Sequence, residues 1–157
     1  MCVVREDDGV SAPRTLNSLA EATLPAAVAD ARVIAVGEPN HGSREFFTLR
    51  TALTIDAIKR GASVVALEAP TDTVHALDRY VQGHVSWHDD LLRAVGSWPW
   101  RTVETREFLQ ALREVARTQP GRFRVVGVDP QVPVRAATSL AHWAQSAQVR
   151  HRHDLRD

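Results

Sequence analysis

Three short apolar segments, each ending in an acidic residue, constrain the fold of this chain more than any other feature of its sequence. They are rich in Val, Ile and Ala and cover residues 32–38, 62–68 and 122–129. Short apolar runs of this kind are typical of buried strands. Helical patterns separate each run from the next, and strands that alternate with helices pair in parallel through right-handed crossovers. The sequence therefore predicts an α/β fold with a parallel sheet of three strands or more.

Helical periodicity occupies the intervals between these segments. The clearest example begins at Ser43, a favourable N-cap residue, and ends before Gly61, a typical helix stop. The other intervals are read in the same way. The predicted segments are one or two short helices over 15–31, a helix over 43–60, a helix over 72–83, a loop with a short helix over 83–100, and an amphipathic helix over 103–117.

The 157 residues are enough for a single domain of ordinary size. Residues 1–13 mix Asp, Gly, Ser and Pro without a sustained period, so we expect a loose leader there. Residues 14–144 carry the strand and helix patterns and form the predicted domain. Residues 145–157 are an Arg/His-rich stretch without apolar periodicity, which predicts a polar tail.

Composition excludes several classes of protein. The 19 basic residues equal the 19 acidic ones, so a dedicated partner for nucleic acid or for an anionic membrane is not expected. Cys2 is the only cysteine, which rules out an internal disulfide and a cysteine-rich zinc site. There is no secretory signal pattern and no apolar run long enough for a membrane span. We therefore expect a soluble, cytoplasmic protein.

Acidic residues end all three predicted strands, at Glu38, Glu68 and Asp129. Parallel strands bring their carboxyl ends to one edge of the sheet, where ligands bind in such folds. Carboxylates that lie close together at one edge repel one another, which raises the pKa of at least one of them unless a cation, a proton or a metal compensates. Such repulsion is unfavourable for folding, and a functional pocket is one reason for a protein to retain it. The alternative is that each acid only caps the following helix or turn.

His41 follows Glu38 in the strand-to-helix turn and is the best candidate for a general base. A neutral imidazole can take a proton from water, and a nearby carboxylate can orient it and stabilise the resulting cation. A single histidine in a turn is more often structural or solvated, so this alternative stays open.

Arg50 lies four residues after Phe46 and three before Leu53, which places it on the inward face of the predicted helix. A buried guanidinium needs a partner, and Glu38 or Glu68 would supply one. Periodicity does not distinguish a pair that only stabilises the fold from a cation that polarises a substrate.

A metal site is the main alternative chemistry. Glu38, His41 and Glu68 together could hold a divalent ion that generates hydroxide, although no metal or other cofactor is required by the sequence. His84 and His88 have helical metal-ligand spacing, but their surroundings predict a loop.

Other motifs are absent or ambiguous. There is no G-x-S-x-G nucleophile elbow and no glycine-rich phosphate-binding loop. Trp87, Trp98 and Trp100 either line an apolar substrate cleft or are packing and rim residues, and packing is the commoner role.

Five motifs in order resemble the N-terminal part of the erythromycin esterase family. They span roughly residues 32–131 and are GEPNHGSREFFTLR (37–50), LEAP (67–70), YVQG (80–83), WPWRT (98–102) and GVDPQ (127–131). A set of five is far more specific than any one motif.

The resemblance implies a hydrolase that opens macrolide lactones by direct activation of water, without a cofactor, and hence a role in antibiotic resistance. It implies that His41 is the base, that Glu38 and Glu68 are its acidic partners, and that Arg50 is an active-site cation. The implied partner is a small-molecule ester or lactone.

The chain also departs from that family. Family members are much longer and supply at least one more active-site histidine, so we expect residues 14–144 to be a partial domain and the chain to be truncated. Such a chain would hydrolyse esters poorly alone and could self-associate through an open sheet edge. The alternatives are an inactive remnant that acts as a binding module, or a metal-dependent hydrolase that uses the same Glu/His cluster.

Overall fold

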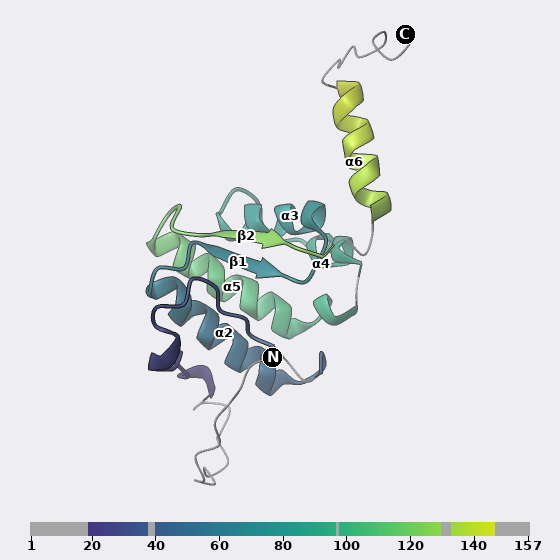
Figure 1. Cartoon of the computed structure of the whole chain (residues 1–157). Coiled ribbons are helices and arrows are strands. Elements are labelled where there is room, and N and C mark those ends of the chain that lie inside the picture. Colours follow the sequence, from purple (N-terminus) through teal and green to yellow (C-terminus); the bar gives the residue numbers. More distant parts are fainter. Residues whose placement is uncertain (1–18, 38–39, 97, 130–132, 147–157) are drawn as a thin grey trace, which may run out of the picture.

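The computed structural model describes residues 19–37, 40–96, 98–129 and 133–146 (Figure 1). Most of its helices gather around a short parallel sheet (Figure 1). The elements, in chain order, are η1 (Ala26–Val28), α2 (Arg44–Lys59), β1 (Val64–Leu67), α3 (Thr71–Val81), α4 (Asp90–Val95), η2 (Trp98–Trp100), α5 (Val103–Thr118), β2 (Arg124–Gly127) and α6 (Pro133–Ser146).

Local sequence signals place the helix ends close to where they were predicted. Ser43 is the N-cap residue of α2, and Gly61 follows its last turn with a φ of 116° that favours glycine. Gly83 follows α3 in the same way, with a φ of 83°. Thr102 caps α5 with its side chain, whose oxygen accepts a hydrogen bond from the Thr105 amide at 3.2 Å.

The sheet consists of β1 and β2, which pair in parallel with Val64 opposite Arg124 and Leu67 opposite Gly127. Parallel pairing joined by α3, α4 and α5 is consistent with the predicted α/β class. The prediction of a strand over 32–38 has a different outcome, because residues 32–37 are not assigned to a strand and are exposed. Glu38 lies outside the described residues, and a sheet of three strands is not shown.

Anchoring at one end explains the path of residues 32–37. The Leu24 amide donates to the Asp56 carboxylate at 2.8 Å, and the Arg60 guanidinium donates to the Leu24 carbonyl at 2.9 Å. These bonds hold the chain at the C-terminal end of α2, a helix of 16 residues and about 24 Å. The chain must therefore run back along α2 to reach Ser43. Apolar β-branched residues favour that extended backbone, but only pairing with a neighbour makes a strand.

One face of the sheet belongs to a single hydrophobic core. Val65 and Leu67 of β1 and Val125 of β2 are buried, whereas Val64 and Ala66 are exposed on the opposite face. The core residues come from both strands, from α2, α3, α4, η2 and α5, and from the loops beside them. They are Ile58, Val65, Leu67, Ala69, Val74, Leu77, Tyr80, Val81, Leu91, Leu92, Val95, Trp100, Phe108, Leu109, Leu112, Ala116, Phe123 and Val125.

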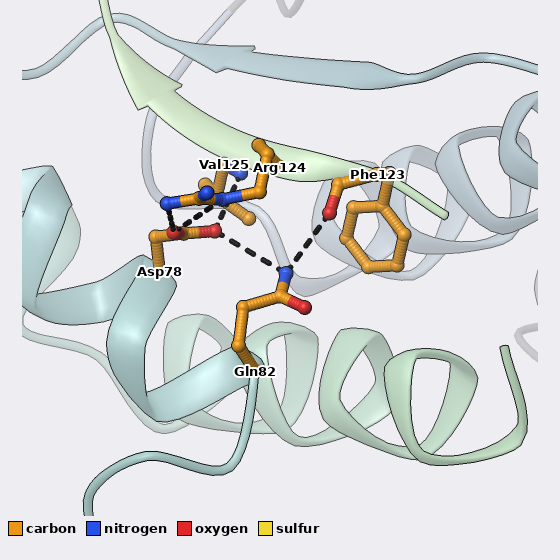
Figure 2. A network of polar contacts seen from close by, with 5 residues as sticks. All are labelled: Asp78, Gln82, Phe123, Arg124 and Val125. Atoms are coloured by element: carbon orange, nitrogen blue, oxygen red, sulfur yellow. Dashed lines mark hydrogen bonds and ion pairs between the residues drawn. The ribbon is translucent and has the colours of Figure 1, made fainter. Parts of the chain in front are cut away.

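Side chains of α3 pair with the outer edge of β2, the edge that points away from β1 (Figure 2). Asp78 accepts from the Val125 amide at 2.9 Å, and Gln82 donates to the Phe123 carbonyl at 3.0 Å. At the other end of the strand, the Thr71 hydroxyl donates to the Gly127 carbonyl at 2.8 Å. Backbone groups of alternate residues are thus satisfied by side chains, which blocks this edge for another strand.

Asp78 is the centre of this network and is only 1% exposed. Its Oδ2 atom lies 2.6 Å from the Arg124 guanidinium in an ion pair. Its Oδ1 atom, which accepts from the Val125 amide, also accepts from the Gln82 side-chain amide at 3.3 Å. Burial raises the pKa of Asp78, but the hydrogen bonds from Arg124, Val125 and Gln82 outweigh burial and leave the pKa below its usual value. A charged carboxylate is therefore the form that stabilises the packing of α3 on β2.

Apolar residues remain exposed away from this core. They include Val64 on the open sheet face, Val128 just after β2, and Leu140 and Trp143 on α6. Helix α6 extends away from the rest of the domain (Figure 1). Within the described part of the chain, no helix has the length and apolarity needed to cross a membrane.

Candidate functional site

The carboxyl ends of both strands form one edge of the sheet, as the sequence predicted. The Val128 amide donates to the Leu67 carbonyl at 3.0 Å, and the Asp129 amide donates to the Ala69 carbonyl at 3.1 Å. These bonds continue the strand pairing beyond β1 and β2. Glu68 and Asp129, two of the three acids at predicted strand ends, therefore lie on adjacent segments at this edge, and Glu68 is exposed.

Gly127 allows the two segments to approach so closely. A Cβ atom at this position would lie 2.7 Å from the carbonyl oxygen of Pro70 and 2.8 Å from its carbonyl carbon. Both atoms belong to the backbone and cannot rotate away. A side chain at residue 127 would therefore push the end of β2 away from the loop that follows Glu68.

Arg50 points inward from α2, as its helical spacing predicted, and its guanidinium lies among three aromatic rings. Its Cζ atom is 4.2 Å from the ring centroid of Phe47, and 5.6 Å from the ring centroids of both Trp100 and Phe108. All three rings are at least nine-tenths buried. Contacts at these distances are favourable cation–π interactions, and they fix the side chain on the inner side of α2.

Trp100 connects this cation to the carboxyl edge of the sheet. Its indole Nε1–H donates to the backbone carbonyl of Glu68 at 3.3 Å. The same indole ring contacts the guanidinium of Arg50. One buried side chain thus links Arg50 of α2, the helix that precedes β1, to the end of that strand.

His41 lies in the exposed turn that leads into α2. The turn is shaped by Asn40, whose side-chain oxygen accepts from the Gly42 amide at 3.1 Å. The Ser43 hydroxyl donates to the Glu45 carboxylate at 2.6 Å, and this bond lowers the pKa of Glu45. The N-terminal end of α2 therefore carries His41, and Arg50 follows two helical turns after Ser43 on the same helix.

The remaining candidate residues have different outcomes. Glu38 lies outside the described residues, so its position relative to His41 stays a prediction. Among the residues that the structure describes, no group of three or more His, Cys, Asp or Glu side chains is arranged to hold a metal ion. That finding does not test the proposed set of Glu38, His41 and Glu68, because it leaves out one of the three.

Sequence reasoning missed the role of Trp100, which it weighed only as cleft lining or packing. The three tryptophans in fact differ, since Trp98 is 66% exposed and Trp87 packs edge-on against Tyr80 at 5.2 Å. The WPWRT motif places Trp100 two residues before the N-cap of α5, but it does not indicate which residues the ring contacts.

Comparison with known proteins identifies a family. The erythromycin esterase family model matches residues 58–156, which is more than half of the chain. No solved structure matches the chain. The matched region contains Glu68 and four of the five motifs and continues beyond Gln131, where the last motif ends, whereas His41 and Arg50 precede it. The chain belongs to the erythromycin esterase family.

Proposed function

We propose that the chain is a hydrolase of carboxylic esters, of the erythromycin esterase type, that activates water directly. His41 takes the proton from the attacking water, and Glu38 and Glu68 orient the imidazole and stabilise its charged form. Arg50 stabilises the negative charge that develops on the carbonyl oxygen of the ester. No metal or other cofactor takes part in this scheme, and the substrate class is a macrolide lactone or a related ester.

The observation that carries this proposal is the link between Arg50 and Glu68. The Arg50 guanidinium is held by three buried rings, and one of these rings donates to the backbone carbonyl of Glu68. Arg50 is therefore a preorganised cation linked through Trp100 to the carboxyl edge of a parallel sheet. Membership of the erythromycin esterase family supports the same class of reaction.

We expect turnover to be slow. His41 and Glu68 are both exposed, so water surrounds them and weakens their electrostatic coupling. A site of this kind also lacks the exclusion of water that strengthens charge stabilisation in the transition state, where one preorganised donor contributes about 10²–10³ in rate.

The test compares the purified chain with two histidine variants on simple aryl esters and on a macrolide lactone. Mass spectrometry measures lactone opening as the gain of one water. We expect slow turnover that His41→Ala abolishes and that His88→Ala, a change at an exposed histidine outside the proposed site, leaves intact. Turnover that survives His41→Ala, or no turnover by the parent chain at high protein concentration, would contradict the proposal.

The second candidate function is a binding module that pairs with a second copy of the chain. The exposed apolar residues Val64 and Val128 lie on and beside the sheet, and α3 side chains cover the outer edge of β2 but not the opposite edge, on β1. Pairing would then use β1. Sedimentation velocity measures the association, and we expect a dimer that Val64→Lys dissociates. A monomeric parent chain at all concentrations would exclude this candidate.

A further inference from the structure

The strongest unassigned feature of the candidate site is the position of Trp100 between two proposed functional residues. We propose that Trp100 is a positioning residue, which couples the orientation of the Arg50 guanidinium to the peptide of Glu68. This inference rests on the proposed function, because that function gives Arg50 and Glu68 their roles. It adds a residue that touches neither the water nor the ester in the proposed scheme.

Trp100 is held firmly enough to serve as such a link. It ends η2, where the Arg101 amide donates to the Trp98 carbonyl at 2.9 Å. The N-cap of α5 follows at once, with the Thr102 side chain bonded to the amide of Thr105, a residue that is 1% exposed. These bonds restrain the backbone of Trp100 beside α5, and the ring itself is restrained because Trp100 is buried in the hydrophobic core.

The two contacts of the indole use different parts of it. The ring face meets the Arg50 guanidinium, and the Nε1–H reaches the Glu68 carbonyl at the end of β1. A shift of the indole that preserved one contact would disturb the other. Phe47 and Phe108 contact the same guanidinium but have no polar group with which to hold the strand end.

The chain contains a matched control for this arrangement. Trp87 also places its ring near a guanidinium, with Arg106 Cζ at 5.1 Å from the ring centroid, and its indole N–H also donates, at 3.2 Å to Asp89. This second set reproduces the chemistry of the first, but its hydrogen-bond acceptor is a side chain in an exposed loop and not the end of β1. Changes at Trp87 therefore report the general effect of losing a tryptophan with these contacts.

The first experiment does not depend on activity. It is an NMR test, called the relay test below, of whether a change at Arg50 reaches the peptide of Glu68 through Trp100. Two-dimensional ¹H–¹⁵N spectra of the full chain resolve the indole N–H of each tryptophan and the backbone amide of Ala69, which follows Glu68. We expect Arg50→Lys to shift the Trp100 indole signal and the Ala69 amide in the parent chain. In a Trp100→Phe background, which keeps an aromatic ring but lacks the donor, the Ala69 shift should disappear.

The same spectra contain the control. Arg106→Lys should move the Trp87 indole signal and leave both Trp100 and Ala69 unchanged. An Ala69 shift of equal size with and without the Trp100 donor would overturn the proposal, as would a Trp100 signal that does not respond to Arg50→Lys.

The second experiment measures the catalytic consequence. We expect Trp100→Phe to lower kcat about five- to tenfold, the equivalent of one hydrogen bond, with little change in KM, whereas Trp87→Phe should leave both constants near the parent values. Equal losses in the two variants would contradict a positioning role. If the parent chain shows no turnover, the proposed function fails, while the relay test still decides whether Trp100 couples Arg50 to the end of β1.

Discussion

Removing the buried carboxylate of Asp78 should destabilise the fold more than removing any exposed acid. In Asp78→Ala, the Val125 amide loses its acceptor on the outer edge of β2, and Gln82 loses one of its two partners (Figure 2). The Arg124 side chain is 61% exposed, so its guanidinium returns to water at little cost. The loss of stability therefore comes chiefly from the Val125 amide, which is left without a hydrogen-bond acceptor.

The magnitude follows from these contacts. A buried amide without an acceptor costs about 1–3 kcal/mol, and the bond with Gln82 adds about 1 kcal/mol. Alanine recovers about 0.5 kcal/mol through its higher helix propensity. We expect Asp78→Ala to lower the free energy of unfolding by about 1.5–3.5 kcal/mol. Asp78→Asn should lower it less, because an amide oxygen can still accept from Val125.

Urea denaturation followed by circular dichroism measures these differences. The matched control is Asp90→Ala, which removes an ion pair of 3.4 Å with Arg93 between two largely exposed side chains. A pair of this kind contributes about 0–1 kcal/mol, so this variant should unfold close to the parent chain.

The pH dependence has a definite sign. Because the pKa of Asp78 is lower in the folded chain than its ordinary value of 3.8, its stabilisation is complete above that value. It is lost as the pH falls below 3.8 through the folded pKa, so the difference between parent and Asp78→Asn should be smaller at about pH 3 than at about pH 6. A difference that stays constant over this range, or an Asp78→Ala variant as stable as Asp90→Ala, would refute the reasoning.

Three further predictions concern other contacts. Gly127→Ala should lower the melting temperature strongly because a Cβ atom would meet the backbone of the loop after β1, whereas Gly42→Ala, with open space around it, should have little effect in the same thermal melt. Asp56→Ala should release the segment before α2, so trypsin should cleave after the exposed Arg32 faster than in the parent chain; an unchanged rate would show that the anchor is not needed. Arg50→Ala should lower the melting temperature, and Arg50→Lys should recover only part of the loss, because an ammonium group does not stack on aromatic rings as a guanidinium does. Equal melting temperatures for the parent chain and Arg50→Ala would show that the ring contacts do not stabilise the fold.

Local signals in the sequence determined most of the secondary structure. Ser43 and Gly61 delimit α2, and the short apolar runs around residues 64–67 and 124–127 became β1 and β2. These signals depend on neighbours within a few residues, which is why they can be read directly from the chain. The inward direction of Arg50 was available for the same reason, since helical spacing fixes the face of a side chain.

The candidate site was only partly accessible to sequence reasoning. The order of strands and helices predicted that Glu68 and Asp129 would meet at one sheet edge, and the backbone bonds beyond β1 and β2 agree. The grouping of Glu38 and His41 with them stays a prediction. The link through Trp100 was not predictable, because its two contacts join residues 32 and 50 positions away in the chain.

Tertiary structure alone decided which apolar segments pair as strands and which edge of the sheet is covered by side chains. Residues 32–37 have the composition of a strand, yet composition favours only an extended backbone, and a strand also needs a partner for its backbone groups. The outer edge of β2 is satisfied by Asp78 and Gln82 from α3, more than 40 residues earlier. No local pattern encodes such bonds, because they form only when packing brings the helix against the strand.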